Sequence, residues 1–152
     1  MTSAPPPTLA VFNASEDTVA FVSLFFEGLG YRVVTQSWPA YDPLRAEVAD
    51  AFLSQYHADV VIFDVSLPYS ENWQHFLQFK KVLDRRKIAI VLTTTNKHAL
   101  AEMTGMTSAL EIVGKPYDLE QLAAAVRDAM LRKSSSGSTS PTTNPDSVPE
   151  SL

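Results

Sequence analysis

The chain alternates short continuous apolar runs with longer stretches in which apolar residues recur three or four positions apart. A short apolar run is typical of a strand that is buried on both faces of a parallel sheet. These runs predict strands at residues 8–12, 31–35, 60–64, 88–93 and 110–114. The third run is Val60-Val61-Ile62-Phe63, and it ends in a single carboxylate, Asp64.

The stretches between the strands have the apolar spacing of amphipathic helices. They predict helices at residues 16–28, 43–55, 73–83, 98–103 and 119–132. In the first helix the apolar positions are Val19, Phe21, Val22, Phe25, Phe26 and Leu29. In the last helix they are Leu122, Ala125, Val126 and Ala129. Gly30 is expected to end the first helix, because glycine readily adopts the left-handed conformation that follows many helices.

Regular alternation of strands and helices predicts an α/β fold with helices on both faces of the sheet. We expect a doubly wound, five-stranded parallel sheet of the flavodoxin-like type, in one domain at residues 8–132 after a tail at 1–7. Residues 133–152 are rich in serine, threonine and proline and are predicted to be disordered. This tail fits a native terminus and a linker to a further domain equally well.

Composition narrows the function classes. The 152 residues are 45% apolar and 19% charged, which suits one globular domain. A net charge of -5 predicts that this chain alone does not bind nucleic acid, and the lysines and arginines at 80–87 are interpreted as a solvated helix end. The absence of cysteine excludes thiol catalysis and disulfides. No apolar run approaches the roughly 20 residues of a membrane span, so we expect a cytoplasmic protein without a membrane partner.

Polar side chains follow three of the predicted strands. Asp64 follows the third strand, Thr93 ends the fourth, and Lys115 follows the fifth. Parallel strands bring their carboxyl ends to one edge of the sheet, where α/β proteins usually bind ligands. A carboxylate can attack a phosphoryl group, a lysine can pair with the added charge, and a hydroxyl can bond a phosphoryl oxygen. Together the three residues predict a phosphoryl-acceptor site.

With these residues, the chain resembles the receiver domains of two-component response regulators over residues 8 to about 132. The matching segments are VVIFDVSLP at 60–68, IVLT at 90–93, GKPY at 114–117 and LGY at 29–31. The resemblance implies that Asp64 is the phosphoacceptor, Thr93 the switch hydroxyl and Lys115 the lysine that pairs with the phosphoryl group.

The chain departs from the receiver pattern at the metal site and at the aromatic switch. Receivers usually end their first strand with two adjacent acids that hold Mg²⁺, but Asn13 and Ala14 stand there. Asp64 would be the one acid certain to face Mg²⁺, so we expect this site to be weak or absent. Glu16 and Asp17 lie nearby, at a helix start that suits capping better than metal binding. A common switch aromatic is replaced by Ile112.

The leading interpretation is an atypical receiver domain in a phosphorelay, which is not an enzyme and signals by protein contact. Its expected partners are a histidine kinase or phosphotransfer protein and a downstream protein, and a homodimer remains open. In the family the output face is often formed by the last two helices and the last strand, here residues 97–132. One alternative is a pseudo-receiver that never takes phosphate. A flavodoxin-like cofactor protein is less favoured, because residues 13–18 contain no glycine and two acids.

Overall fold

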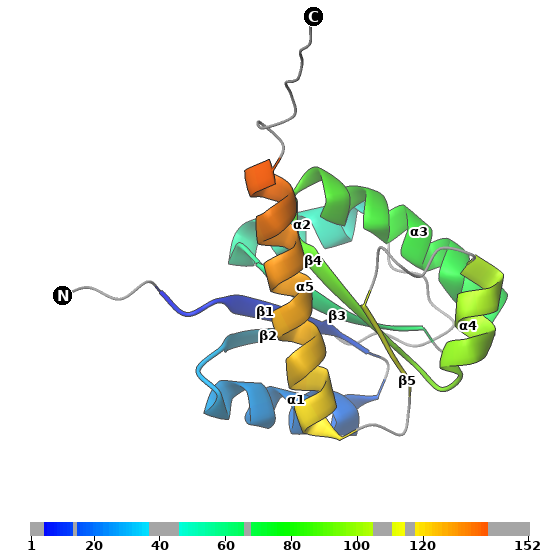
Figure 1. Cartoon of the computed structure of the whole chain (residues 1–152), viewed down its shortest axis with the longest axis horizontal. Coiled ribbons are helices and arrows are strands. Elements are labelled where there is room, and N and C mark those ends of the chain that lie inside the picture. The colour runs from blue at the N-terminus through cyan, green and yellow to red at the C-terminus, as the bar shows by residue number, and fades with distance from the viewer. Residues whose placement is uncertain are drawn as a thin grey trace, which may run out of the picture.

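A computed structural model of the chain describes residues 5–13, 15–36, 46–65, 68–104, 111–114 and 118–139. Figure 1 shows five strands and the helices that connect them. The strands are β1 (Thr8–Phe12), β2 (Arg32–Gln36), β3 (Val60–Val65), β4 (Ala89–Thr94) and β5 (Glu111–Gly114). The helices are α1 (Glu16–Gly28), α2 (Ala46–Tyr56), α3 (Tyr69–Arg85), α4 (Lys97–Thr104) and α5 (Leu119–Thr139).

The strands pair in the order β2-β1-β3-β4-β5, and every pair is parallel. This arrangement confirms the predicted doubly wound, flavodoxin-like sheet. The predicted bounds of β1 and α1 agree with the structure. β3 and β5 differ from their predicted bounds by one residue at one end, and β2 and β4 are shifted by one residue at both ends. The agreement follows from the continuous apolar runs, which mark strands buried on both faces.

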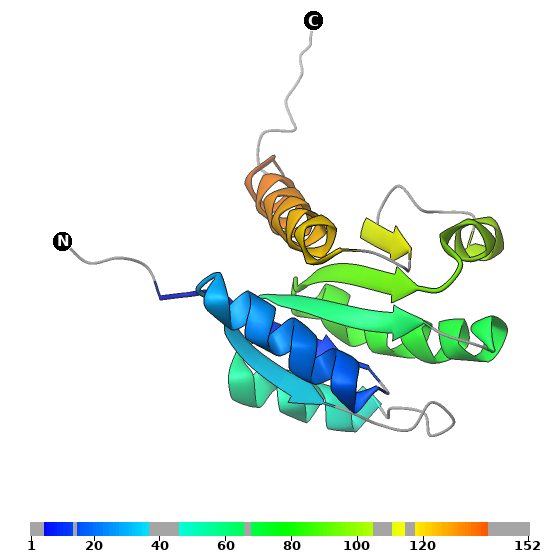
Figure 2. The ribbon, with the colours of Figure 1, turned by 90° about the horizontal axis from the view of Figure 1, so that it is seen from below.

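Each face of the sheet carries its own apolar core, and Figure 2 shows helices on both sides. Val61, Phe63 and Val65 of β3 pack with α3 and part of α2 and α4 in one core. Val60 and Ile62 pack with α1 and α5 in the other. This division follows from the alternation of side chains along a strand, which sends neighbouring residues to opposite faces.

Gly30 ends α1 as predicted. It has a φ of 99°, and the N–H of Tyr31 donates to the carbonyl of Phe26 at 3.0 Å. The same pattern ends α3, where Lys87 has a φ of 57° and the N–H of Ile88 donates to the carbonyl of Leu83 at 2.9 Å. At both helix ends, a residue in the left-handed conformation lets the next backbone N–H donate to a carbonyl of the last turn. That residue is glycine after α1 and lysine after α3.

Three helices are longer than predicted, although α4, predicted at 98–103, gains only one residue at each end. The predicted start of α3 was residue 73, but the helix begins at Tyr69, because its first turn is polar and apolar spacing does not reveal it. The prediction that the chain is disordered from residue 133 is wrong for residues 133–139, which continue α5. Extending an existing helix needs no new nucleus, so residues of low helix propensity such as Ser and Gly can follow a packed segment. Residues 140–152 of that tail lie outside the described residues.

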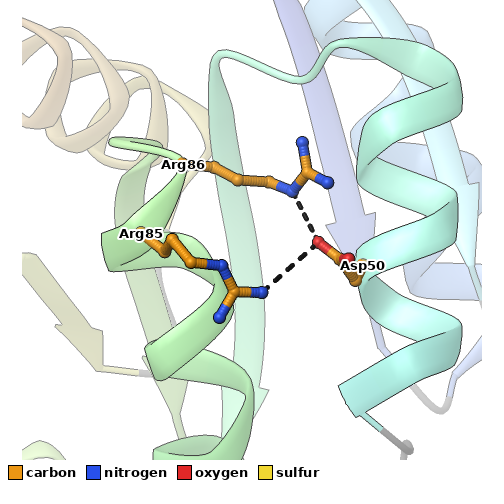
Figure 3. A network of polar contacts seen from close by, with 3 residues as sticks. All are labelled: Asp50, Arg85 and Arg86. Carbon is orange, nitrogen blue, oxygen red and sulfur yellow. Dashed lines mark hydrogen bonds and ion pairs between the residues drawn. The ribbon is translucent and has the colours of Figure 1, made fainter.

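Helices α2 and α3 are joined by ion pairs at Asp50 (Figure 3). Oδ1 of Asp50 lies 2.6 Å from Nε of Arg86 and 3.7 Å from a terminal nitrogen of Arg85. The hydrogen bond from Arg86 lowers the pKa of the Asp50 carboxyl below its usual value, partly opposed by desolvation, and the positive charges of Arg86 and Arg85 add to the lowering. The ionised carboxylate is thus favoured in the folded state.

The Asp50 ion pairs should make stability depend on pH. A carboxyl whose pKa is lower in the folded chain stabilises the fold above its unfolded pKa, and this contribution disappears as the pH falls through the folded pKa. We expect Asp50→Asn to unfold at a lower urea concentration than the wild type at neutral pH, but not below the folded pKa. Arg86→Gln should resemble Asp50→Asn at neutral pH, whereas Arg85→Gln should have a smaller effect. A pH-independent difference would contradict this account.

Candidate functional site at the carboxyl edge of the sheet

Asp64 and Thr93 lie side by side at the carboxyl edge of the sheet. They are partners in the parallel register of β3 and β4, and both belong to the side of the sheet covered by α1 and α5. The hydroxyl of Thr93 donates to Oδ1 of Asp64 at 2.6 Å. Thr93 is fully buried, whereas Asp64 is only partly buried. The structure therefore brings together two of the three predicted site residues, with the carboxylate still reachable from solvent.

Asn13 comes directly after β1, where the receiver pattern has its first acid. Because Phe12 of β1 pairs with Phe63 of β3, the next residues along the two strands are Asn13 and Asp64. Asn13 is buried, and its side-chain oxygen accepts the N–H of Ser15 at 2.8 Å. The amide oxygen is thus engaged in shaping the turn into α1. Ala14 lies outside the described residues.

The nearby acids Glu16 and Asp17 belong to the first turn of α1 and are exposed. Ser15 caps this helix, because its hydroxyl oxygen accepts the N–H of Thr18 at 3.2 Å. Negative side chains in a first turn stabilise the helix dipole, so both acids have a structural role there. Among the described residues, no three histidine, aspartate or glutamate side chains gather as metal ligands would.

The described residues do not fit a strong Mg²⁺ site. Mg²⁺ requires several oxygen ligands, usually including carboxylates that replace part of its hydration shell. At this edge Asp64 offers a carboxylate, while Asn13 offers an amide whose oxygen already accepts a hydrogen bond. Weak Mg²⁺ binding nevertheless stays a prediction, since Ala14 and Lys115 lie outside the described residues.

A second polar contact crosses between the segments that follow β3 and β4. The hydroxyl of Tyr69, in the first turn of α3, is hydrogen-bonded to the hydroxyl of Thr95. Next to Thr95, Asn96 caps α4, since its side-chain oxygen accepts the N–H of Ala99 at 2.9 Å. The sequence alone does not reveal this role of Tyr69, because a residue just before the apolar stretch at 73–83 gives no sign of a partner 26 residues away.

The fold is that of solved receiver structures. A response regulator receiver protein from Sinorhizobium medicae WSM419 superposes with a TM-score of 0.62 at 17% identity, covering 84% of this chain and 97% of that structure. A response regulator receiver domain protein from Clostridium thermocellum gives 0.64 at 19% identity, with the same coverages. A CheY-like receiver domain protein from Methanospirillum hungatei JF-1 gives 0.63 at 14% identity, covering 87% and 99%. The chain has the receiver-domain fold.

A curated relative of this receiver-like domain is the transcriptional regulatory protein VxrB of Vibrio cholerae. The two are 34% identical over 107 residues, which is 69% of this chain and 42% of VxrB. No protein-family model matches the chain. The chain thus spans less than half the length of VxrB. Because VxrB is a transcriptional regulatory protein, this relative does not support the expectation that the chain has no nucleic-acid partner.

The third predicted site residue of the receiver-like domain, Lys115, lies outside the described residues, which end β5 at Gly114. A Cβ atom added to Gly114 would lie 3.0 Å from Cβ of Lys97, the first residue of α4. Only glycine permits this close approach without a shift of α4. Ile112 is paired with Leu92 in the register of β4 and β5. Gly114 therefore lets the end of β5 lie close to the start of α4.

None of the helices in the described part of the receiver-like domain has both the length and the apolar character of a membrane span.

The bond between Thr93 and Asp64 should be measurable as stability. Thr93→Val keeps the shape of a fully buried side chain but removes the donor to a carboxylate, so we expect unfolding to become easier by about 1 to 2 kcal/mol. Thr93→Ser retains the hydroxyl and should lose less. The neighbouring buried Thr94 is a matched control, because its hydroxyl makes only a long contact of 3.4 Å with the N–H of Asn96. Equal losses in Thr93→Val and Thr94→Val, by urea denaturation, would contradict a specific bond.

Proposed function

We propose that this chain is an atypical receiver domain of two-component signalling, in which Asp64 accepts a phosphoryl group. The observation that supports this most is the bond between Asp64 and the buried hydroxyl of Thr93 at the carboxyl edge of the sheet. A reachable carboxylate beside a fixed hydroxyl is suited to phosphoryl transfer. In this role the domain passes on a signal and does not turn over a substrate.

In the proposed reaction a carboxylate oxygen of Asp64 attacks the phosphorus of a phosphohistidine or a small phosphodonor. A phosphorus–oxygen bond forms as the bond to the donor nitrogen or oxygen breaks, and the leaving group keeps that electron pair. A released histidine nitrogen takes up a proton, whereas a carboxylate released from an acyl phosphate leaves as the anion. Thr93 then donates to a phosphoryl oxygen in place of Oδ1 of Asp64. Lys115 pairs with the added negative charge, a role that rests on the sequence resemblance.

A pseudo-receiver that works without phosphate is a second candidate. It is supported by Asn13, which stands in place of an acid and already bonds Ser15. In this alternative the same fold presents a constant binding surface.

Phosphorylation can be tested by incubation with acetyl phosphate followed by intact-mass measurement. We expect a mass increase of one phosphoryl group that is lost in Asp64→Asn and slowed in Thr93→Val. The rate should depend little on Mg²⁺, because Asn13 lacks the negative charge that attracts the cation. Asn13→Asp is the control that should make the rate depend on Mg²⁺. A wild-type chain that gains no mass with any small phosphodonor would refute phosphoacceptance and favour the pseudo-receiver.

The partner surface is best placed on α1. Four large apolar side chains are exposed among the described residues. Three lie on α1 or in its terminal turn, namely Phe21 at 63%, Leu24 at 71% and Leu29 at 50%, whereas Leu131, at 66%, lies alone on α5. By contrast, Leu122 and Val126, in the output face expected from the family, are buried in the core. Grouped exposed apolar side chains mark interaction sites more often than scattered ones do.

Charge on α1 indicates the kind of partner. The helix carries acids at both ends, Glu16, Asp17 and Glu27, and contains no lysine or arginine. A helix with an apolar stripe and basic flanks would cover Phe21 and Leu24 while its charges complement these acids. We therefore propose that the kinase, phosphotransfer protein or downstream protein presents such a helix to α1. A second copy of this chain lacks that complementarity if two acidic α1 helices meet.

This assignment predicts binding of a designed helical peptide with a leucine stripe and lysine flanks. We expect saturable binding by fluorescence anisotropy, weakened at least about tenfold in a Phe21→Ser, Leu24→Ser double variant. A peptide with the same stripe and glutamate flanks should bind more weakly, and Leu131→Ser on α5 should have little effect. If the protein is a dimer that the double variant converts to monomer, then a second copy occupies α1 and the proposed partner is wrong.

A further inference from the structure

Two polar bridges join β3 and the segment after it to β4 and the segment after it. One is the hydrogen bond from Thr93 to Asp64, on the side of the sheet that α1 and α5 cover. The other is the hydrogen bond between the hydroxyls of Tyr69 and Thr95. Tyr69 packs against the core on the opposite side of the sheet. Hydrogen bonds at Thr93 and Thr95 therefore hold the end of β4 and the residue after it, with one partner from each side of the sheet.

The short segment from Thr95 to Asn96 also sets the start of α4. The backbone carbonyl of Asn96 accepts the N–H of Leu100 at 3.1 Å, and its side chain accepts the N–H of Ala99 at 2.9 Å. Thr95 and Asn96 are both exposed, so core packing does not hold their side chains in place. Among the described residues, the hydrogen bond between the hydroxyls of Tyr69 and Thr95 connects this exposed turn to α3.

We infer that Tyr69 is a positioning residue for the candidate site. By holding Thr95, its hydroxyl keeps the turn after β4 in the conformation that directs Thr93 to Asp64 and starts α4 at Lys97. A disturbance at Asp64 can then reach α4 through Thr93, Thr95 and Asn96. The effect on phosphate acceptance rests on the proposed function, whereas the effect on the α4 cap does not.

The bond is separable from the packing of the Tyr69 ring. Phenylalanine keeps the ring that contacts the core and removes only the hydroxyl, and Thr95→Val removes the other half of the bond with little change in shape. Thr95→Ser keeps a hydroxyl and is the conservative rescue. Tyr31 is a matched control, because it precedes β2 at the opposite edge of the sheet and also packs by its ring on a core.

The first measurement is amide hydrogen exchange of Ala99, read by NMR in the full chain. Loss of one hydrogen bond should speed exchange about fivefold in Tyr69→Phe and in Thr95→Val. The double variant should exchange no faster than either single variant, since both remove the same bond. Thr95→Ser and Tyr31→Phe should resemble the wild type. Unchanged Ala99 exchange in Tyr69→Phe, or additive effects in the double variant, would overturn the inference.

The second measurement is the rate of phosphorylation by acetyl phosphate. Tyr69→Phe and Thr95→Val should lower the maximal rate by about threefold, without changing the donor concentration that gives half of it, while Thr95→Ser restores the rate. A merely structural role would alter stability without this selective loss. An unchanged maximal rate would overturn the link to Asp64. If the wild type accepts no phosphate, the proposed function fails, and Ala99 exchange still decides the role of Tyr69.

Discussion

The parallel register of β3 and β4 is the constraint on which the candidate site depends. It places Asp64 opposite Thr93 and Val65 opposite Thr94, so that one hydroxyl meets the carboxylate while its neighbour points to the other core. A slip of one residue would exchange the faces of all these side chains. The register is in turn secured by apolar residues on both faces, which would lose their burial in any shifted pairing.

Aromatic packing gives the core beneath α3 its rigidity. The ring centroids of Phe12, Phe63 and Phe79 lie 4.9 to 6.3 Å from one another, and the ring of Phe63 also packs against that of Phe76. This cluster joins β1 and β3 to α3 just before the strands deliver Asn13 and Asp64. The polar edge can therefore vary in chemistry without loss of the fold. That independence explains how the receiver fold can persist where the usual pair of acids does not.

Replacement of an acid by Asn13 changes the electrostatics of this edge. Several carboxylates in close contact repel one another and are stabilised by a bound cation. Here Asn13 adds no charge, and Asp64 accepts a hydrogen bond from Thr93. The proposed weak binding of Mg²⁺ rests on this loss of negative charge.

The sequence by itself determined the order of strands and helices along the chain, the parallel sheet, and the meeting of Asp64 and Thr93 at one edge. It could do so because the spacing of apolar residues within each short segment indicates whether that segment is a strand or a helix. The tertiary structure decided what depends on distant segments. It paired Tyr69 with Thr95 and Asp50 with Arg86, and it continued α5 past its apolar stripe. It also left Phe21 exposed, because helical spacing shows which residues share a face but not whether another element covers that face.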